Sequence, residues 1–324
     1  MTIRRCLSSL KIKWLLAKEI FSFWKLIRRH NASVASEKSS NKMRYSLLRD
    51  THVIEKAMSL RNPRRGFGQQ KILGILDKIE VYLKYPENDI EFVKYPLAVI
   101  KSYIDYTQTI GVNIHQIEDR YRHLLSKVNG EKISFVSGVT HITRKEIIEQ
   151  SGKSFESFLY SRHSVRYFTS VVPDREQIER ALLMAQQTPS ACNRQGWRTH
   201  LFFGESSYQL VRWQQGANGF EDEVHCSILV TADLNAFFSH EVHQAYVDGG
   251  MYAMTLIHAL HSLGLGTIPL SCGVYCDRLY KLKELFAIPD NEVPILIIGT
   301  GNMEDSFRVA VSARKEVSET NTYH

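Results

Sequence analysis

Cysteine is scarce in this chain, which has 5 cysteines among 324 residues. So few and so scattered thiols exclude a disulfide scaffold, and their odd number is typical of a reducing compartment. Long hydrophobic runs are also missing, because the longest, such as 14–17 and 295–298, fall far short of the roughly 20 residues that cross a bilayer. No apolar stretch with a small-residue cleavage site follows the start. We therefore expect no signal peptide and a cytoplasmic protein.

Several patterns of catalytic and metal-binding residues are missing as well. Cys272 and Cys276 lie four apart without a second pair of ligands, so we expect no metal site there. His240 and His243 lack a third ligand, and we interpret them, with Glu241, as a solvated helix face. No convincing arrangement of a nucleophile with its base is found among the side chains.

Charge is unevenly distributed along the chain. Residues 1–150 hold 27 Lys+Arg and 15 Asp+Glu, a net charge of +12, whereas the remaining residues hold 14 and 19, a net charge of −5. Globular proportions of hydrophobic (44%) and charged (23%) residues exclude a wholly disordered chain, and the length suits two domains. The basic half meets one criterion for nucleic-acid binding, but no recognised motif follows, so we expect no nucleic-acid partner.

The basic half has the periodicity of helices. Apolar residues recur at helical spacing from Ile3 to His30 with lysines and arginines among them, which predicts a basic amphipathic helix or two short ones. Residues 1–30 either contact an anionic membrane surface or pack on their own protein. Further helices are expected over 42–60, 69–83, 96–110 and 114–128. We assign residues 1–130 to a basic helical region and residues 131–153 to a polar linker.

From Phe155 onward helical and strand patterns alternate. Apolar, β-branched and aromatic runs predict strands over 199–204, 226–232 and 293–299. Helices are expected over 178–187 and 244–263, the second with Gly264 at its C-terminal cap. We therefore predict an α+β domain over residues 154–324.

The first polar segment of this domain is Arg162-His163-Ser164-Val165-Arg166. It brings two guanidiniums, an imidazole and a hydroxyl into five positions, and such groups bind phosphate through charge-assisted hydrogen bonds. Alone, the segment is a weak signal, and the basic end of a helix is the simpler interpretation.

Three further segments have comparable chemistry. The loop 188–197 is dense in amide and hydroxyl side chains, which suit either a flat heterocycle or the loop's own backbone. In 264–273 the glycines permit close backbone approach, and we expect Pro269 to fix a turn whose N–H groups face a ligand. Residues 308–315 alternate like an edge strand that ends in positive charge. Trp213 and Phe220 either line a substrate pocket or pack in the core.

The order and spacing of these segments resemble the flavin-dependent nitroreductase family. The resemblance rests on Arg162-His163-Ser164-Val165-Arg166, Pro189-Ser190-Ala191-Cys192-Asn193-Arg194-Gln195-Gly196-Trp197, Gly264-Leu265-Gly266 with Pro269-Leu270-Ser271, Ile298-Gly299 and Arg314-Lys315. It covers residues 155–320, about half of the chain. It implies an α+β fold in which helices flank a nitroreductase-like FMN-binding sheet, with an all-helical N-terminal extension.

The resemblance also implies a cofactor and a reaction. FMN would have its phosphate on Arg162, Ser164, Arg166 and Arg314, with His163 near the ring edge or the phosphate. Ser190, Asn193 and Gln195 would also bind the cofactor, Asn193 through the isoalloxazine. The backbone of Pro269, Leu270 and Ser271 would lie along the ring. NAD(P)H would be the reductant in a ping-pong hydride transfer to a small organic acceptor such as a nitro compound, a quinone or a related electrophile.

Members of this family form homodimers whose two FMN sites lie at the interface, so site residues are expected from both chains. Gly196 stands where the family has proline, and Ser271 stands where many members have an acidic residue. Cys272 would lie near the flavin as a candidate redox thiol. The alternative function is a catalytically reduced flavin-fold protein that binds or scaffolds through its basic helical region.

Overall fold

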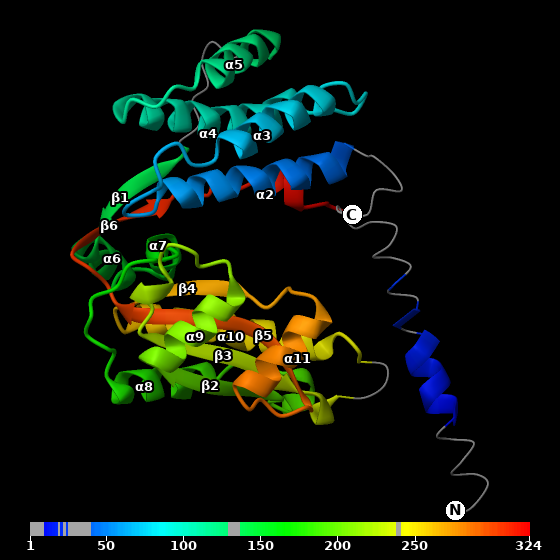
Figure 1. Cartoon of the computed structure of the whole chain (residues 1–324). Helices are drawn as coiled ribbons and strands as arrows, with labels where there is room; N and C mark the ends of the chain where they lie inside the picture. The colour runs from blue at the N-terminus through cyan, green and yellow to red at the C-terminus, as the bar shows by residue number, and fades with distance from the viewer. Residues whose placement is uncertain (1–9, 19, 22–23, 25–39, 129–136, 238–240) are drawn as a thin grey trace, which may run out of the picture. The chain divides into compact units, whose positions relative to one another are not determined.

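The computed structural model describes residues 10–18, 20–21, 24, 40–128, 137–237 and 241–324 (Figure 1). By backbone contacts the chain forms two compact units. One contains Ile142–Phe307 together with the described residues up to Trp24, and the other contains the helices between residues 40 and 128 together with Arg308–His324. Among the described residues, no helix combines the length and the apolar content that a membrane crossing requires.

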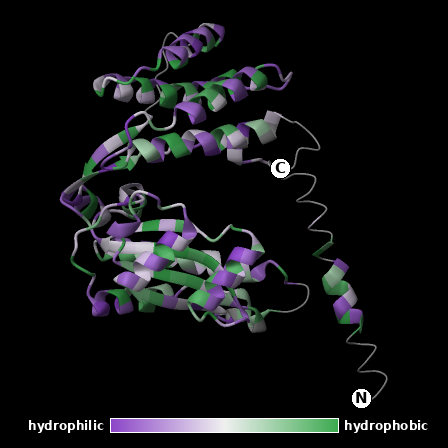
Figure 2. Ribbon diagram, in the orientation of Figure 1, coloured by the Kyte–Doolittle hydropathy of each residue, from purple (hydrophilic) through white to green (hydrophobic). Residues whose placement is uncertain are grey.

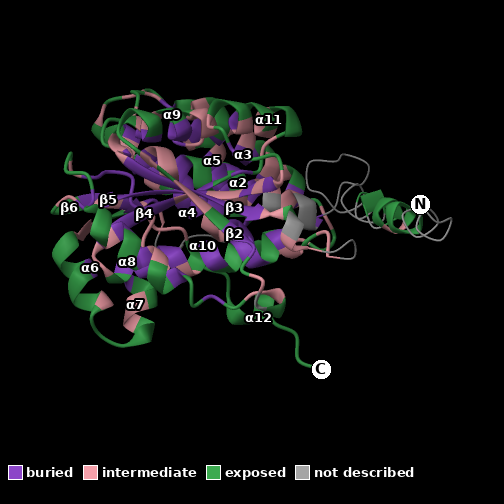
Figure 3. Cartoon of the chain, turned by 90° about the horizontal axis from the view of Figure 1, so that it is seen from below, coloured by how far each residue is buried: buried purple, intermediate pink, exposed green. Residues whose placement is uncertain are grey.

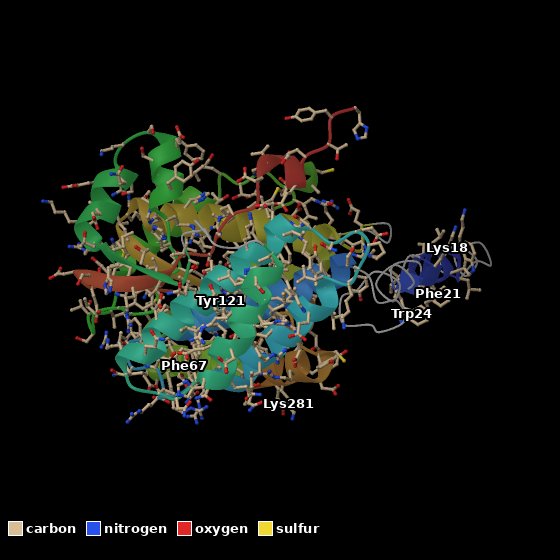
Figure 4. The ribbon with its side chains drawn as sticks, turned by 90° about the horizontal axis from the view of Figure 1, so that it is seen from above. Lys18, Phe21, Trp24, Phe67, Tyr121 and Lys281 are labelled. Carbon is tan, nitrogen blue, oxygen red and sulfur yellow. The ribbon has the colours of Figure 1, made fainter. Side chains whose placement is uncertain are left out.

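The helical unit is built on α2 (Ser40–Met58), α3 (Gln69–Tyr82), α4 (Ile90–Thr109) and α5 (His115–Lys127). The four predicted helices are confirmed, with different ends. Their apolar faces form one core, which includes Phe67 and Tyr121 (Figure 4). Helix α4 begins six residues earlier than predicted, because the Asp89 side chain accepts a hydrogen bond from the Phe92 N–H and caps the helix. Pro96 therefore lies inside the helix and not at its start.

The C-terminal segment belongs to this helical unit. Strand β6 (Ser306–Ala310) pairs with β1 (Val139–Thr143) in a two-stranded sheet. The boundary between the two units falls inside each of these strands. The Arg308 guanidinium donates to the Arg61 carbonyl, and Arg44 forms an ion pair with Glu319 beside α12 (Val317–Thr320). The predicted domain 154–324 therefore differs from the observed unit, because residues 308–324 pack with the helices.

The predicted linker 131–153 contains regular structure in its described part. After β1 comes α6 (Arg144–Ser151), which begins with a capping box between Thr143 and Glu146. Residues 131–136 lie outside the described residues.

The second unit is a four-stranded antiparallel sheet with the order β2-β3-β5-β4. The strands are β2 (Trp197–Phe203), β3 (Cys226–Asp233), β4 (Leu265–Ser271) and β5 (Glu292–Asn302). Helices α9 (Glu205–Gln214) and α11 (Cys276–Leu285) lie on one side of the sheet, and α8 (Arg175–Ala185) and α10 (Gln244–Ser262) lie on the other (Figure 3). The predicted α+β class is confirmed.

The segment 264–273 is not the turn that its glycines and proline predict. Residues 265–271 form the edge strand β4, which pairs with β5 from Leu265 opposite Asn302 to Ser271 opposite Leu296. An edge strand tolerates proline because one side of it has no full strand partner, and Pro269 lies opposite Ile298 there. Only Gly264, with a φ of +79°, has the left-handed conformation expected at a helix cap.

Two glycines of this sheet make room for an aromatic side chain. Gly266 and Gly301 lie opposite each other in the β4–β5 pair. A Cβ atom on Gly301 would lie 2.8 Å from the Phe168 ring, and one on Gly266 would lie 3.1 Å from it. Phe168 is 3% exposed, so its ring fills the space that side chains would need.

A buried histidine joins α10 to the short helix α7 (Phe155–Ser161). His261 Nε2 lies 2.7 Å from Ser161 Oγ, and its ring packs 5.0 Å from that of Phe158. Burial, together with the charges of Arg162, His258 and His163, lowers the pKa of His261 to about 4. The folded protein therefore holds this imidazole neutral at neutral pH.

This histidine predicts a pH-dependent stability. The imidazole binds a proton near pH 6.5 in the unfolded chain and near pH 4 in the folded one. The neutral imidazole therefore contributes its full stability above pH 6.5, and this stability is lost as the pH falls toward 4. We expect a loss of about 3 kcal/mol in the free energy of unfolding, measured by urea denaturation. His261→Gln should flatten this part of the profile, whereas His123→Gln on exposed α5 should not. Parallel profiles for the wild type and His261→Gln would contradict the assignment.

The paired glycines give a second prediction. Gly301→Ala places a methyl group against the buried Phe168 ring, and we expect the free energy of unfolding to fall by about 1–3 kcal/mol. Gly74→Ala is the matched control, because no atom lies within 4 Å of its added Cβ and alanine favours the surrounding helix α3. Equal effects of the two substitutions in urea denaturation would show that the sheet does not need glycine at position 301.

Candidate functional site

The Arg-His-Ser motif leaves α7 and runs beside the edge strand β4. Arg162 is the C-terminal cap of α7, and Ser164 forms a parallel bridge with Thr267. The Val165 N–H donates to the Thr267 carbonyl at 2.9 Å. Phe168 then bridges to Met303 beyond the end of β5. The motif is therefore anchored to the sheet at both ends, and its position depends on the glycine pair beneath Phe168.

One guanidinium of the motif is almost fully buried. Arg166 is 4% exposed, and its guanidinium carbon lies 6.0 Å from the centre of the Phe220 ring. Phe220 itself is buried, which confirms the packing alternative for this residue. A cation buried to this degree is stabilised by an anion placed against it. Arg166 is therefore not part of a solvated helix end.

The other motif residues are less buried. Arg162, His163 and Ser164 are half-buried. The charge of Arg162 adds to burial in lowering the pKa of His258 and of His261, which is evidence for a positive potential around the end of α7. His163 lines a cavity of about 250 Å³ together with Glu146 of α6 and Tyr160 of α7.

The second motif, 189–197, is a tightly held loop before β2. The buried Asp248 of α10 accepts a hydrogen bond from the Ala191 N–H at 3.1 Å, and Ser190 Oγ accepts one from the Gln195 N–H at 3.0 Å. Cys192 and Gln195 both have a φ of +50°. The Ser190 hydroxyl is thus hydrogen-bonded to the backbone of its own loop. The side chain of Asn193, which the family resemblance places on the flavin ring, lies outside what the structure describes.

Arg194 fixes the same loop from the other side. Its guanidinium forms two 2.7 Å hydrogen bonds to the Glu241 carboxylate and one to the Ala191 carbonyl. The interpretation of Glu241 as part of a solvated face was therefore wrong, because a half-buried ion pair holds it. A Cβ atom on Gly196 would lie 2.9 Å from Ala236 and from Phe237, so glycine at this departure from the family pattern has a steric reason.

The third segment, 269–271, ends the edge strand β4. Pro269 is half-buried, Leu270 is buried and Ser271 is exposed. The Ser271 carbonyl accepts a hydrogen bond from Gln214 Nε2 at 2.9 Å, and its hydroxyl accepts one from the Gly273 N–H. Close by in α9, Trp213 packs against the Arg278 guanidinium at 5.0 Å. This segment adjoins the Arg-His-Ser motif because Ser164 pairs with Thr267 of the same strand.

The strand register separates the second motif from the other two. Ser271 lies opposite Leu296, Leu296 opposite Val230, and Val230 opposite Thr199, two residues into β2. The loop 189–196 and the end of β4 are thus at the same end of the sheet but on opposite edges. Three strand spacings, about 14 Å in all, lie between them.

Arg314 is not in the same compact unit as the other predicted site residues. It belongs to the helical unit, where it lines a cavity of about 420 Å³ with Arg44, Phe92 and Tyr95. Its guanidinium donates to the Ser312 carbonyl at 2.6 Å. Its assignment to a phosphate site therefore stays a prediction.

Cys226 and Cys272 are buried free thiols. Burial raises the pKa of the Cys272 thiol to about 12, and the same holds for Cys226. A redox-active cysteine needs its thiolate, so Cys272 lacks the property that the redox interpretation requires. Over the described part of the chain, no three His, Cys, Asp or Glu side chains gather where a metal ion could bind.

Sequence reasoning missed the residues that support the motifs. Asp248 and Glu241 hold the loop 189–197, and Thr267 aligns the Arg-His-Ser segment. The pairing of Arg194 with Glu241 joins residues 47 positions apart, so no local pattern indicates it. Asp248 did carry a signal, because it is an acidic residue within a long apolar helix.

Comparison with known proteins covers the same half of the chain. Residues 159–302 match the family model described as the Nitroreductase family. A protein of Archaeoglobus fulgidus named "Putative NADH dehydrogenase/NAD(P)H nitroreductase" is 26% identical over 150 residues, which are 45% of this chain and 84% of that protein.

Two solved structures are also similar over this region. A nitroreductase family protein of Streptococcus pneumoniae has a TM-score of 0.45 and 21% identity, over 53% of this chain and all of that one. An FMN-dependent nitroreductase of Clostridium difficile has a TM-score of 0.41 and 20% identity, over 45% of this chain and 86% of that one. The C-terminal half of the chain, over residues 159–302, is a nitroreductase-like domain.

Proposed function

We propose that this chain is an FMN-dependent oxidoreductase that takes electrons from NAD(P)H and passes them to a small organic acceptor. The nitro, quinone and related electrophilic groups are the acceptor classes that the family resemblance implies. The observation that carries the proposal is the buried Arg166 in a motif anchored to β4, next to 269–271 and inside the family match.

The residues present fit the phosphate of FMN. Arg162 and Arg166 offer two guanidiniums, and Ser164 adds a hydroxyl donor on the same short segment. The buried Thr267 hydroxyl, on the residue paired with Ser164, has no hydrogen-bond partner in the structure. A buried hydroxyl of this kind is costly unless a ligand satisfies it. This orphaned donor, on the residue paired with Ser164, supports an anion at the junction of α7 and β4.

FMN, when bound, supplies the hydride chemistry, and the protein supplies position and electrostatics. In this proposal Arg162, Ser164 and Arg166 hold the phosphate. The backbone of 269–271 positions the ring, and the amide groups of Asn193 and Gln195 hydrogen-bond to its polar edge. NAD(P)H and the acceptor occupy the same pocket in turn, which is the basis of ping-pong kinetics. No side-chain nucleophile is required.

We further propose that the complete site needs a second copy of the chain. The loop 189–196 and the end of β4 lie on opposite edges of the sheet, so one copy would supply the phosphate clamp and the other the loop. Helix α10 offers the apolar face for such an assembly: Val247, Met251 and Met254 follow helical spacing and are each about 40–50% exposed. Asp248 of the same helix accepts hydrogen bonds from the loop and from Gln244, which would couple dimer formation to the site.

The phosphate clamp predicts a loss of flavin binding. Arg162→Ala with Arg166→Ala removes two charged donors, and we expect FMN binding to weaken by about 10- to 100-fold for each, measured from the flavin retained after gel filtration. Arg180→Ala with Arg175→Ala on exposed α8 is the matched control and should retain FMN. Because Arg166 is buried, circular dichroism must show the double variant folded, and Arg162→Ala alone should still weaken binding. Unchanged retention in a folded variant would exclude this clamp.

A site shared between two chains predicts complementation. A chain with Arg162→Ala and one with Asn193→Ala should each oxidise NAD(P)H poorly with a quinone or nitroaromatic acceptor. Co-expressed heterodimers would contain one intact site, made of the clamp of the second chain and the loop of the first. We expect about half of wild-type turnover per heterodimer. No recovery would place the whole site within one chain.

The same assay tests the alternative function. A wild-type protein that binds FMN but oxidises no NAD(P)H with either acceptor would be a flavin-fold binding or scaffold protein. The basic composition of residues 1–150 is the observation that favours this alternative.

A further inference from the structure

The N-terminal helix exposes an unusual number of large apolar side chains. Residues 10–18, 20–21 and 24 are helical. The exposed apolar side chains are Leu10, Ile12, Trp14, Leu16, Ile20, Phe21 and Trp24, with exposed fractions from 37% to 62%. Most of the described helix is exposed in Figure 3, although Figure 2 shows hydrophobic residues along it. Leaving this much apolar surface in water is unfavourable, so a partner surface is expected to cover it.

Three of the four charged residues within 10–24 are lysines, and two of these, unlike Lys13, share a regular spacing. Lys11 and Lys18 are seven residues apart, and Lys25 continues the interval in the sequence. Seven residues are nearly two helical turns, so this spacing puts lysines in a narrow stripe along one side of a helix. Residues 1–30 contain eight lysines and arginines and a single acidic residue, Glu19.

The aromatic residues of the helix are of the kind that favours an interface between water and hydrocarbon. Phe21 and Trp24 stack with their ring centres 5.3 Å apart, and the Lys18 ammonium lies 5.5 Å from the Trp14 ring (Figure 4). Tryptophan has an apolar body and a polar N–H, and it is enriched where membranes meet water. Lysine can extend its aliphatic stem along apolar surface while its charge stays among polar headgroups.

The distribution of these residues favours a lipid surface over a protein groove. A helix that docks in a protein groove needs only a narrow apolar stripe at positions i, i+3, i+4 and i+7. Here apolar residues occupy most of the circumference, as Ile12 and Leu16 lie on a different side from Trp14 and Phe21 at 100° per residue. A bilayer accepts such a broad face, and lysines recurring every two turns keep the helix in the interface plane.

We propose that residues 10–24 bind the surface of an anionic phospholipid bilayer. In this arrangement Trp14, Ile20 and Phe21 insert among the acyl chains, and Lys11 and Lys18 lie at the level of the headgroup phosphates. The proposal goes beyond the oxidoreductase function, because it would localise the nitroreductase-like domain at a membrane surface without changing its chemistry.

Sedimentation of the full chain with lipid vesicles tests this proposal. We compare vesicles of phosphatidylcholine with vesicles in which about one third of the lipid is phosphatidylglycerol. We expect at least tenfold stronger binding to the anionic vesicles at low salt. This preference should disappear at about 1 M salt, where the Debye length is about 3 Å.

Two pairs of substitutions separate the apolar and the electrostatic contributions. Trp14→Ser with Phe21→Ser should abolish binding to both kinds of vesicle, whereas Leu285→Ser, at an exposed leucine of α11, should not. Lys11→Gln with Lys18→Gln should remove the anionic preference, whereas Lys84→Gln with Lys127→Gln on the helical unit should preserve it. Every variant should retain as much FMN as the wild type, so the outcome does not depend on the proposed enzyme function.

Three results would overturn the proposal. They are the absence of vesicle binding, equal binding to neutral and anionic vesicles at low salt, and binding that survives Trp14→Ser with Phe21→Ser. If the helix instead joins two copies of the chain, the same apolar substitutions would reduce the molecular mass measured by light scattering without lipid, and vesicle binding would be absent.

Discussion

The contact between Phe168 and two facing glycines is the constraint on which the candidate site depends. Gly266 and Gly301 lie opposite each other in the β4–β5 pair, and the Phe168 ring occupies the space that their side chains would fill. This contact, with the backbone bond from Val165 to Thr267, draws the Arg-His-Ser segment alongside the edge strand. It thereby brings this segment next to residues 269–271, although about 100 residues separate the two in the sequence.

The electrostatics of the site follow from that placement. Arg166 is carried into the interior with its charge, and the end of α7 gathers enough positive potential to help hold His261 neutral. A buried cation is costly unless an anion accompanies it, and in our proposal the FMN phosphate is the anion that lies against this guanidinium. The loop 189–196 is equally well fixed, by Asp248 and Glu241, but on the other edge of the sheet. That separation makes a second copy of the chain part of the proposed site.

The sequence predicted the secondary structure and the motifs better than it predicted their contacts. Buried strands such as 226–232 and the helix over 244–263 were evident, because their apolar runs have the length and period of those elements. The segment around Pro269 was predicted as a turn, since proline and glycine usually mark turns, but an edge strand accommodates both. The ion pair of Arg194 with Glu241 and the grouping of Arg314 with the helices arise from tertiary packing, which leaves no local pattern.

Flavin content is the most direct measure of the central claim, that the segment 162–166 and the end of β4 form an FMN site. The full chain, purified and dialysed, should show the visible absorbance bands of a flavoprotein. Denaturation should release FMN in a ratio of about one per chain, because hydride transfer in this proposal needs one cofactor for each phosphate clamp. A colourless protein that takes up no FMN when the cofactor is added in excess would contradict the account.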